Sequence, residues 1–383
     1  MDSSKISTGE QSDRPQAATG SQSATSRRVP QLDFLRGIAI LLVISCHPLV
    51  GTPQASPWEA IVFYPFAYTG WSGVDLFFVL SGFLISGLIF SEFKKTGGFQ
   101  PLRFLIRRAF KIWPGYYVFL ALTLPLLASV HVSMKYPNLL GELLFLQNYI
   151  QPTFWPHTWS LAVEEQFYFC LALILYLAVG RFKSIKYIPY ACLTIMVVAL
   201  IGRFLRAQTG EFETLQSHLR ADALAFGVLL GYLHSFFPER LGALVRPKKT
   251  LLFALLLIAT GLAFHPKIYW FGYVFGLTLA YLGYGLVLVH LVYSSWKENA
   301  VLRTVSVIGV YSYSMYIWLP AVSYIVEIYR ILLEHWSIQL SMFPQVCLCV
   351  FLTIFAGIGM AKLIEFPMLR LRDRYFPAVR TVD

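Results

Sequence analysis

Residues 32–47 read LDFLRGIAILLVISCH, an apolar run with charges near its start and an imidazole at its end. At about 100° per residue, the eleven steps from Arg36 to His47 place both side chains on one helical face, about 16 Å apart along the axis. A cation near one end of a membrane helix and an imidazole near the other predict a site reached from both membrane faces. Alternatively, Arg36 extends to lipid headgroups and His47 only packs at the helix end. The pair alone leaves both interpretations open.

The composition extends the membrane interpretation to the whole chain. Of its 383 residues, 57% are hydrophobic and 13% are charged, which excludes an ordinary soluble domain. A transmembrane helix needs about 20 mainly apolar residues, and ten stretches qualify. They lie near residues 34–52, 71–90, 112–130, 163–180, 187–202, 221–237, 250–265, 270–293, 304–326 and 342–364. We therefore predict an all-α fold, a polytopic transmembrane helical bundle of about ten spans.

The placement of Lys and Arg predicts how this bundle is oriented. If the N-terminus is cytoplasmic and the spans alternate, 25 of the 31 Lys and Arg fall on cytoplasmic segments or inner helix ends. This positive-inside bias predicts that both termini are cytoplasmic. The net charge of +11 therefore faces anionic lipid or an anionic cytoplasmic ligand, and nucleic acid is not expected as a partner.

We divide the chain into three parts. Residues 1–29 are rich in Ser, Gln, Thr and Ala, and we predict a disordered cytoplasmic tail there. Residues 30–372 form the predicted membrane domain, and residues 373–383 a short cytoplasmic C-terminal tail. We find no repeat of solenoid period and no second soluble domain.

The segment PLRFLIRRAFKIWP (101–114) carries Arg107, Arg108 and Lys111 among apolar residues. This pattern predicts a basic amphipathic helix on the inner membrane surface, ending at Trp113 and Pro114. Lipid headgroups are one possible partner. The phosphates of a cytoplasmic, nucleotide-bearing donor are the other, since guanidinium groups suit phosphate geometry.

Several polar residues lie where the predicted outer ends of helices begin. Asp75 is about one turn inside its helix, at a depth where carboxylates are rare unless paired or functional. Trp159 and Glu165 lie in PHTWSLAVEEQFYF (156–169), and Arg220 and Asp222 open a later span. A helix cap accounts for one carboxylate in the 156–169 segment. It does not account for two carboxylates, a histidine and nearby tryptophans together.

These segments together resemble acyltransferase family 3, a family of integral membrane O-acyltransferases. The resemblance runs from about residue 31 to 372 and rests on seven blocks in chain order. The blocks are LDFLRGIAILLVISCH, GVDLFFVLSGFLIS, RRAFKIWPGYY, HTWSLAVEEQFYF, LRADALAFGVLLGYL, YSYSMYIW and IEFPMLRL. The resemblance implies transfer of an acyl group from cytoplasmic acyl-CoA, usually acetyl-CoA, to a hydroxyl of a carbohydrate or related acceptor at the outer face. It also implies that the bacterial inner membrane is the location.

The resemblance and the residues lead to the following site assignments. We assign catalytic roles to His47, Asp75 and Glu165, acyl-CoA binding to Arg36, Arg107, Arg108 and Lys111, and acceptor-side positions to Trp159, Arg220 and Asp222. The family implies that His47 is essential, either as the base that deprotonates the acceptor hydroxyl or as the carrier of the acyl group. We expect no metal and no permanently bound cofactor, because acyl-CoA is a co-substrate.

A transporter is the competing class. Intramembrane His, Asp and Arg also occur in proton-coupled transporters and lipid-linked sugar exporters. We detect no inverted repeat, and the inner basic segment suits a phosphate-bearing donor, so the enzyme is favoured. The outer aromatics, such as Trp58 and Trp159, are suited to stacking on sugar rings or to anchoring at the membrane interface.

Overall fold

A computed structural model describes residues 29–47, 56–129, 135–182 and 184–377. Within these residues the chain is entirely helical and contains no strand, which confirms the predicted fold class. Its α-helices are α1 (Pro30–Cys46), α2 (Pro57–Thr69), α3 (Gly73–Thr96), α4 (Pro101–Ser129), α5 (Tyr136–Leu143), α6 (Trp159–Phe182), α7 (Ile188–Ala207), α8 (Ser217–Phe236), α9 (Pro238–Val245), α10 (Lys248–Ala263), α11 (Leu277–Tyr293), α12 (Ala300–Val310), α13 (Ser312–His335), α14 (Met342–Met360) and α15 (Phe366–Tyr375). Four short helical turns join them. Two are 3₁₀ turns, η1 (Gly70–Ser72) and η2 (Pro156–Thr158), and two are π-helical, η3 (Gly272–Gly276) and η4 (Ala361–Glu365).

Within the described residues, fewer helices than the ten predicted spans have the full length expected of a membrane span. Seven helical stretches of the described residues are long and apolar enough to cross a membrane, and an eighth is added if α8 and α9, bent by 115°, count as one span. Every one of the ten predicted spans contains a helix. However, α1 and α10 have only 17 and 16 residues, short of the roughly 20 that a bilayer requires.

The structure differs from the predicted helices in three places. Between the first two predicted spans lies a further helix, α2, which begins with a capping box between Ser56 and Glu59. The basic segment does not end at Pro114, because α4 continues through it, as membrane helices can when neighbouring groups satisfy the freed backbone. The ninth predicted span, 304–326, is broken at Tyr311, between α12 and α13.

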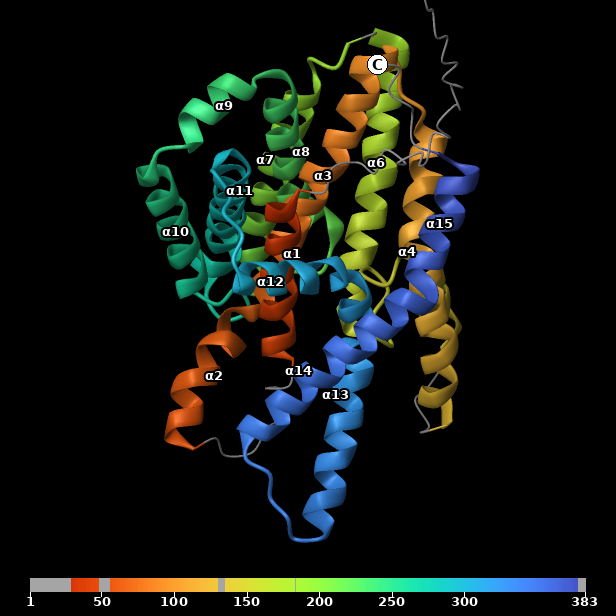
Figure 1. Ribbon diagram of the computed structural model, residues 1–383, viewed down its shortest axis with the longest axis vertical. Helices are drawn as coiled ribbons and strands as arrows, with labels where there is room; N and C mark the ends of the chain where they lie inside the picture. Colours follow the sequence, from red (N-terminus) through yellow and green to blue (C-terminus); the bar gives the residue numbers. More distant parts are fainter. Residues whose placement is uncertain (1–28, 48–55, 130–134, 183, 378–383) are drawn as a thin grey trace, which may run out of the picture.

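The centre of the bundle is α1, with α3, α12 and α13 packed against it (Figure 1). Ala39, Ile40 and Ile44 on α1 are completely buried. Beside it, α3 and α8 come into backbone contact, because a Cβ at Gly82 would lie 2.1 Å from the carbonyl oxygen of Leu224. Small residues permit such close helix packing in membranes.

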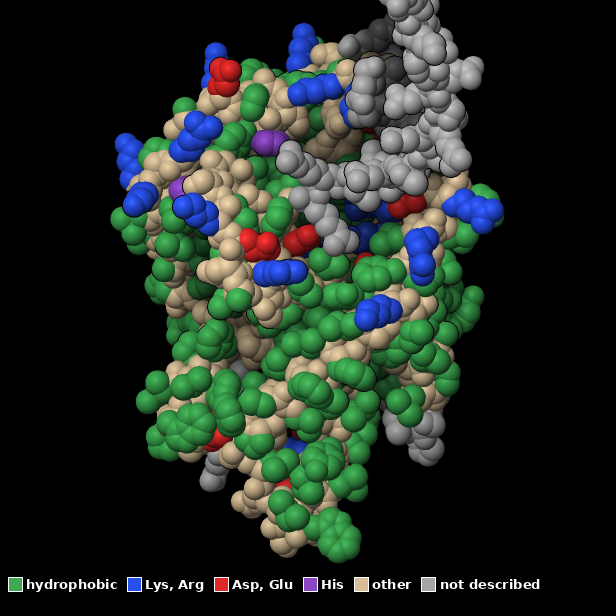
Figure 2. Space-filling view, in the orientation of Figure 1, with side chains coloured by type: hydrophobic (Ala, Val, Ile, Leu, Met, Phe, Trp, Pro, Cys, Tyr) green, Lys and Arg blue, Asp and Glu red, His purple; other side chains and the backbone are tan. Residues whose placement is uncertain are grey.

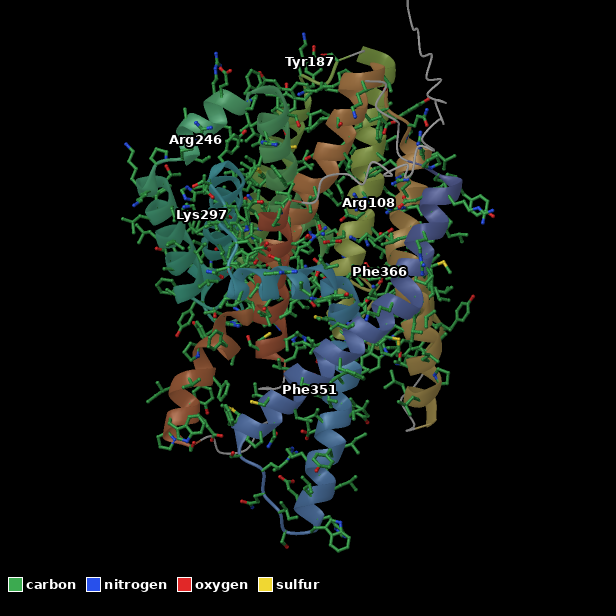
Figure 3. The ribbon with its side chains drawn as sticks, viewed as in Figure 1. Arg108, Tyr187, Arg246, Lys297, Phe351 and Phe366 are labelled. Carbon is green, nitrogen blue, oxygen red and sulfur yellow. The ribbon has the colours of Figure 1, made fainter. Side chains whose placement is uncertain are left out.

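Charge is distributed unevenly between the two ends of the bundle. In Figure 2, Lys and Arg gather in the upper half of the visible face, and the lower half is mostly hydrophobic. Figure 3 shows Arg246 and Lys297 in the upper part, whereas Phe351 of α14 lies in the lower part. This arrangement is the spatial counterpart of the positive-inside bias read from the sequence.

Candidate active site

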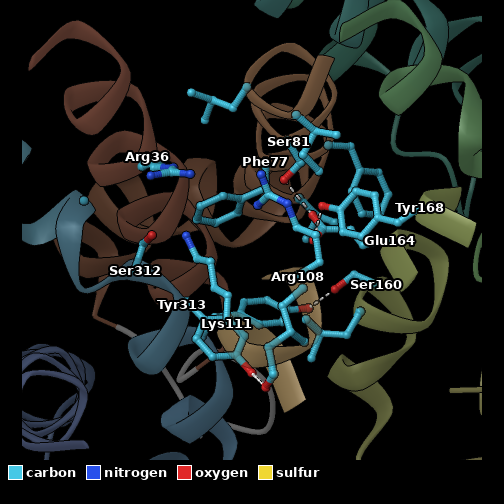
Figure 4. Close-up of a pocket in the computed structure, with 18 of the residues that line it drawn as sticks. Arg36, Phe77, Ser81, Arg108, Lys111, Ser160, Glu164, Tyr168, Ser312 and Tyr313 are labelled. Atoms are coloured by element: carbon cyan, nitrogen blue, oxygen red, sulfur yellow. Dashed lines mark hydrogen bonds between the residues drawn. The ribbon is translucent and has the colours of Figure 1, made fainter. Parts of the chain in front are cut away.

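A cavity of about 100 Å³ lies inside the bundle, where α1, α3, α4, α6, α13 and η4 meet (Figure 4). Its polar lining consists of Arg36, Ser81, Arg108, Lys111, Ser160, Glu164, Tyr168, Ser312, Tyr313, Tyr316 and Glu365. Phe77, Phe78 and several aliphatic side chains complete the wall. The cavity is therefore a partly open space with both polar and apolar walls, to which Gly309 and Val310 of α12 also contribute.

Three of the four residues predicted to bind acyl-CoA line this cavity. Arg108 and Lys111 are three residues apart on α4, so they share one helical face. Arg36 approaches from α1, on the other side of the cavity from Tyr168 (Figure 4). Arg36 also lies 3.8 Å from a carboxylate oxygen of Asp33. The cavity thus gathers three cations from two helices.

Arg107, the fourth predicted residue, does not line the cavity. Its position on α4 is about 100° around the helix axis from Arg108. Its guanidinium lies 3.2 Å from a carboxylate oxygen of Asp373 on α15 and also donates to the carbonyl of Phe376. Arg107 therefore joins α4 to the C-terminal helix.

The cavity carboxylate on α6 is Glu164. Ser160, Glu164 and Tyr168 are spaced one helical turn apart, so all three face the cavity. One Glu164 oxygen accepts a hydrogen bond from Ser81 at 2.9 Å, and the other accepts one from Tyr168 at 3.0 Å. This four-residue spacing is the sequence signal that could have identified Glu164.

Glu165, to which the sequence analysis assigned a catalytic role, faces α4 instead. Its carboxylate is buried and accepts a hydrogen bond from the indole nitrogen of Trp113 at 3.0 Å. Glu165 is not among the residues that line the cavity. Within the described residues it forms no hydrogen bond with His47.

Asp75, Arg220 and Asp222 come together, but they do so in buried ion pairs. Arg220 lies 2.5 Å from Asp75, which joins α8 to α3. Arg203 of α7 lies 2.7 Å from Asp222 and is completely buried. The acidic and basic side chains near the predicted outer ends of these helices therefore pair with one another, although several of their polar atoms form no hydrogen bond within the described residues.

Trp159 links this ion-pair cluster to the cavity wall. The guanidinium carbon of Arg220 lies 5.5 Å from the Trp159 ring and 5.9 Å from the Phe78 ring. The two rings meet edge to face at 5.9 Å. Phe78 itself lines the cavity. Arg220 and its ion pair with Asp75 therefore contact the side of Phe78 that faces away from the cavity.

His47 lies at the end of α1, outside the cavity lining. Its Nδ1 is 2.8 Å from the carbonyl oxygen of Val43. Because a carbonyl only accepts hydrogen bonds, Nδ1 carries the proton, and in the neutral ring Nε2 keeps its lone pair. Its imidazole interacts electrostatically with that of His157. Within the described residues His47 forms no hydrogen bond with Asp75, whose carboxylate pairs with Arg220.

Glu365 is a cavity residue that the sequence analysis missed. It is buried at the end of the π-helical turn η4, and its carboxylate accepts a hydrogen bond from Ser314 at 2.8 Å. A π turn inserts an extra residue and re-aims the side chains around it. No periodic pattern in the sequence shows such a turn. Among the described residues, no group of three or more His, Cys, Asp or Glu is arranged to hold a metal ion.

Comparison with known proteins identifies the class. The acyltransferase domain of acyltransferase family 3 matches residues 29–362. The chain belongs to this family, which confirms the resemblance drawn from the sequence.

Its curated relatives include bacterial O-acetyltransferases. A protein of Staphylococcus aureus strain COL, provisionally named as an O-acetyltransferase, is 30% identical over 226 residues, covering 54% of this chain and 35% of that protein. O-acetyltransferase OatA of Staphylococcus aureus strain NCTC 8325 is 30% identical over 194 residues, covering 46% of this chain and 29% of OatA. The chain thus spans about a third of the length of these relatives. No solved structure gives a significant match.

Proposed function

We propose that this protein is a membrane-embedded O-acyltransferase of the bacterial inner membrane. It transfers an acyl group, in the first instance acetyl, from cytoplasmic acyl-CoA to a hydroxyl of a carbohydrate or related acceptor at the outer face. The observation that carries the proposal is the cavity inside the bundle, with cations from α1 and α4 in its wall. Family membership supports the acyl transfer itself.

The cations of the cavity support an anionic donor. In the part of the chain that the structure describes, neither Arg108 nor Lys111 has a carboxylate within ion-pair distance. Each interacts with a cavity carboxylate only at longer range, Arg108 with Glu164 and Lys111 with Glu365. With Arg36 the cavity holds three cations and two carboxylates, and a partly buried charge is unfavourable without a close partner. The phosphates of acyl-CoA would supply that partner, and a guanidinium can bind phosphate through two parallel hydrogen bonds.

The size of the cavity suggests that acyl-CoA binds in two places, with its thioester arm inside the cavity and its nucleotide outside. Drug-sized ligands occupy pockets of roughly 300–1,000 Å³, and this cavity is about 100 Å³. It admits a slender thioester arm but not a nucleotide. We place the nucleotide at the cytoplasmic mouth, with its arm extending along α1 over the roughly 16 Å that separate Arg36 from His47.

The tautomer of His47 suits acyl transfer to a hydroxyl. With Nδ1–H bonded to Val43, the lone pair of Nε2 is available to accept the acceptor's proton. The acceptor oxygen then attacks the thioester carbon, the C–S bond breaks, and the thiolate recovers the proton. The same lone pair would also permit Nε2 to attack first and carry the acyl group.

Inverted membrane vesicles provide the test. With acetyl-CoA supplied at the exposed cytoplasmic face and an oligosaccharide acceptor inside, the wild type should release CoA thiol and form an O-acetylated product detectable by mass spectrometry. His47→Ala should abolish both while the protein is still inserted. Near-normal product from the His47→Ala variant would contradict the catalytic assignment. Movement of an intact solute without thiol release would identify a transporter instead.

A further inference from the structure

We propose that His157 is a second catalytic histidine, whose ring N–H binds the carbonyl oxygen of the acyl group while His47 takes the acceptor's proton. The proposal rests on the acyltransferase function proposed above. It assigns a role to a buried side chain that the mechanism has not yet used.

The ring of His157 is buried without a hydrogen-bond partner. Its relative exposure is 7%, and neither ring nitrogen forms a hydrogen bond within the described residues. The Ile317 carbonyl lies close enough to interact with the ring but does not meet the geometry of a hydrogen bond. Buried polar groups are rarely left unpaired in native proteins, so an unpaired donor of this kind suggests a missing ligand.

The backbone around His157 is held on both sides. The buried carboxylate of Glu142 accepts hydrogen bonds from the backbone nitrogens of Phe154 at 3.1 Å and Trp155 at 3.4 Å. It also accepts one from the hydroxyl of Thr158 at 3.2 Å. The main chain is thus fixed immediately before and after the histidine. An unpaired ring on a firmly positioned backbone is the arrangement that a preorganised donor requires.

His157 adjoins both the cavity and His47. The hydroxyls of Ser160 and Tyr316, which line the cavity, lie 2.6 Å apart. The Tyr316 hydroxyl also lies 2.6 Å from the backbone carbonyl oxygen of His157, and the two rings are 5.5 Å apart. His157 in turn interacts electrostatically with His47. His157 therefore lies directly behind Tyr316 and Ser160 of the cavity wall, and it interacts both with that wall and with His47 at the end of α1.

The surroundings of His157 suit a neutral donor. Phe119 and Trp155 lie edge-on to its ring at 5.7 and 6.3 Å, and within the described residues no carboxylate pairs with it. A neutral imidazole has one N–H donor. In the assigned step the acceptor O–H bond breaks, its proton moves to Nε2 of His47, and an O–C bond forms at the thioester carbon. The C–S bond then breaks and the thiolate takes the proton from His47, while His157 donates only a hydrogen bond.

The test compares two replacements of similar volume, His157→Gln and His157→Met. Only glutamine retains an N–H donor. We expect His157→Met to lower kcat roughly 10²- to 10³-fold, the range seen when one oxyanion donor is removed, with KM for acetyl-CoA within about twofold of the wild type. His157→Gln should be at least about tenfold faster than His157→Met. His290→Gln is the control, since His290 contacts the Val245 carbonyl outside the cavity, and it should retain wild-type kcat.

Equal rates for the Gln and Met variants, or a Met variant near the wild-type rate, would overturn the role of His157. Size-exclusion profiles and melting curves in detergent check folding, and His157→Leu replaces the Met variant if the latter does not fold. Failure of the underlying function would look different. In that case the wild type itself would release no CoA thiol with acetyl-CoA and acceptor.

Discussion

At the scale of single residues, helical rotation decides which of two adjacent like residues reaches the cavity. Arg107 and Arg108 differ by about 100° around α4, as do Glu164 and Glu165 around α6. In each pair one side chain lines the cavity and its neighbour contacts another helix. Each pair therefore supplies its own matched control, because side-chain type and membrane depth are nearly the same.

The arginine pair tests the donor site. We expect Arg108→Gln to raise the KM for acetyl-CoA at least about tenfold, equivalent to about 1.4 kcal/mol of binding, with little change for the acceptor. Arg108→Lys should retain only part of the wild-type affinity for acetyl-CoA, since lysine lacks the planar guanidinium that binds phosphate through two hydrogen bonds. Arg107→Gln should leave this KM within about twofold and lower the melting temperature instead, because the bond to Asp373 is lost. Initial rates at varied acetyl-CoA measure both, and equal effects on KM would contradict the assignment.

The glutamate pair tests which carboxylate serves the reaction. Glu164→Gln should reduce kcat/KM at least about tenfold, because the amide has only one oxygen to accept the bonds from Ser81 and Tyr168. In Glu165→Gln the amide oxygen can still accept from Trp113, so we expect activity within about threefold of the wild type. Assays of CoA thiol release show which of the two variants loses more activity. A larger loss at Glu165 would return that residue to the catalytic role that the sequence analysis gave it.

At the scale of helices, the contact between α3 and α8 depends on glycine. A Cβ at Gly82 would lie 2.1 Å from the carbonyl of Leu224, while one at Gly87 on the same helix meets nothing within 4 Å. Gly82→Ala should lower the melting temperature by several degrees and weaken acyl transfer, because the helices must separate. Gly87→Ala should be neutral or stabilising by up to about 1 kcal/mol, since alanine favours helix. Thermal unfolding followed in detergent would measure both, and similar shifts would refute the packing argument.

The helices that the sequence predicted well are those with strong, simple patterns. Apolar runs located a helix in every predicted span. The continuation of α4 through Pro114 was missed because it depends on neighbouring groups. The position of Glu365 depends on a π turn, and the Asp75–Arg220 pair joins residues 145 apart. Such features arise from tertiary packing, which one sequence does not encode in any local pattern.

At the scale of the whole molecule, the basic end of the bundle predicts its orientation. Lys and Arg in the upper half of Figure 2 should face the cytoplasm. In a cysteine-free background, needed because the native cysteines are free thiols, an impermeant thiol reagent should label Gln151→Cys on intact cells. Glu298→Cys should be labelled only after the membrane is opened. The reverse pattern would invert the topology and with it the side from which acyl-CoA enters.

The buried ion pairs also bear on how the chain is made. Arg203 and Asp222 lie on the consecutive helices α7 and α8, so they can neutralise each other as soon as this hairpin forms. Asp75 pairs with a residue 145 positions later. At about 5–20 residues per second, synthesis delays that partner by roughly 7–30 s. During this interval α3 carries an unpaired carboxylate in its first turn, and charges are costly inside lipid. We expect α3 to remain next to the insertion machinery until α8 emerges, so the helices made first complete their packing only after the second half of the chain has begun to appear.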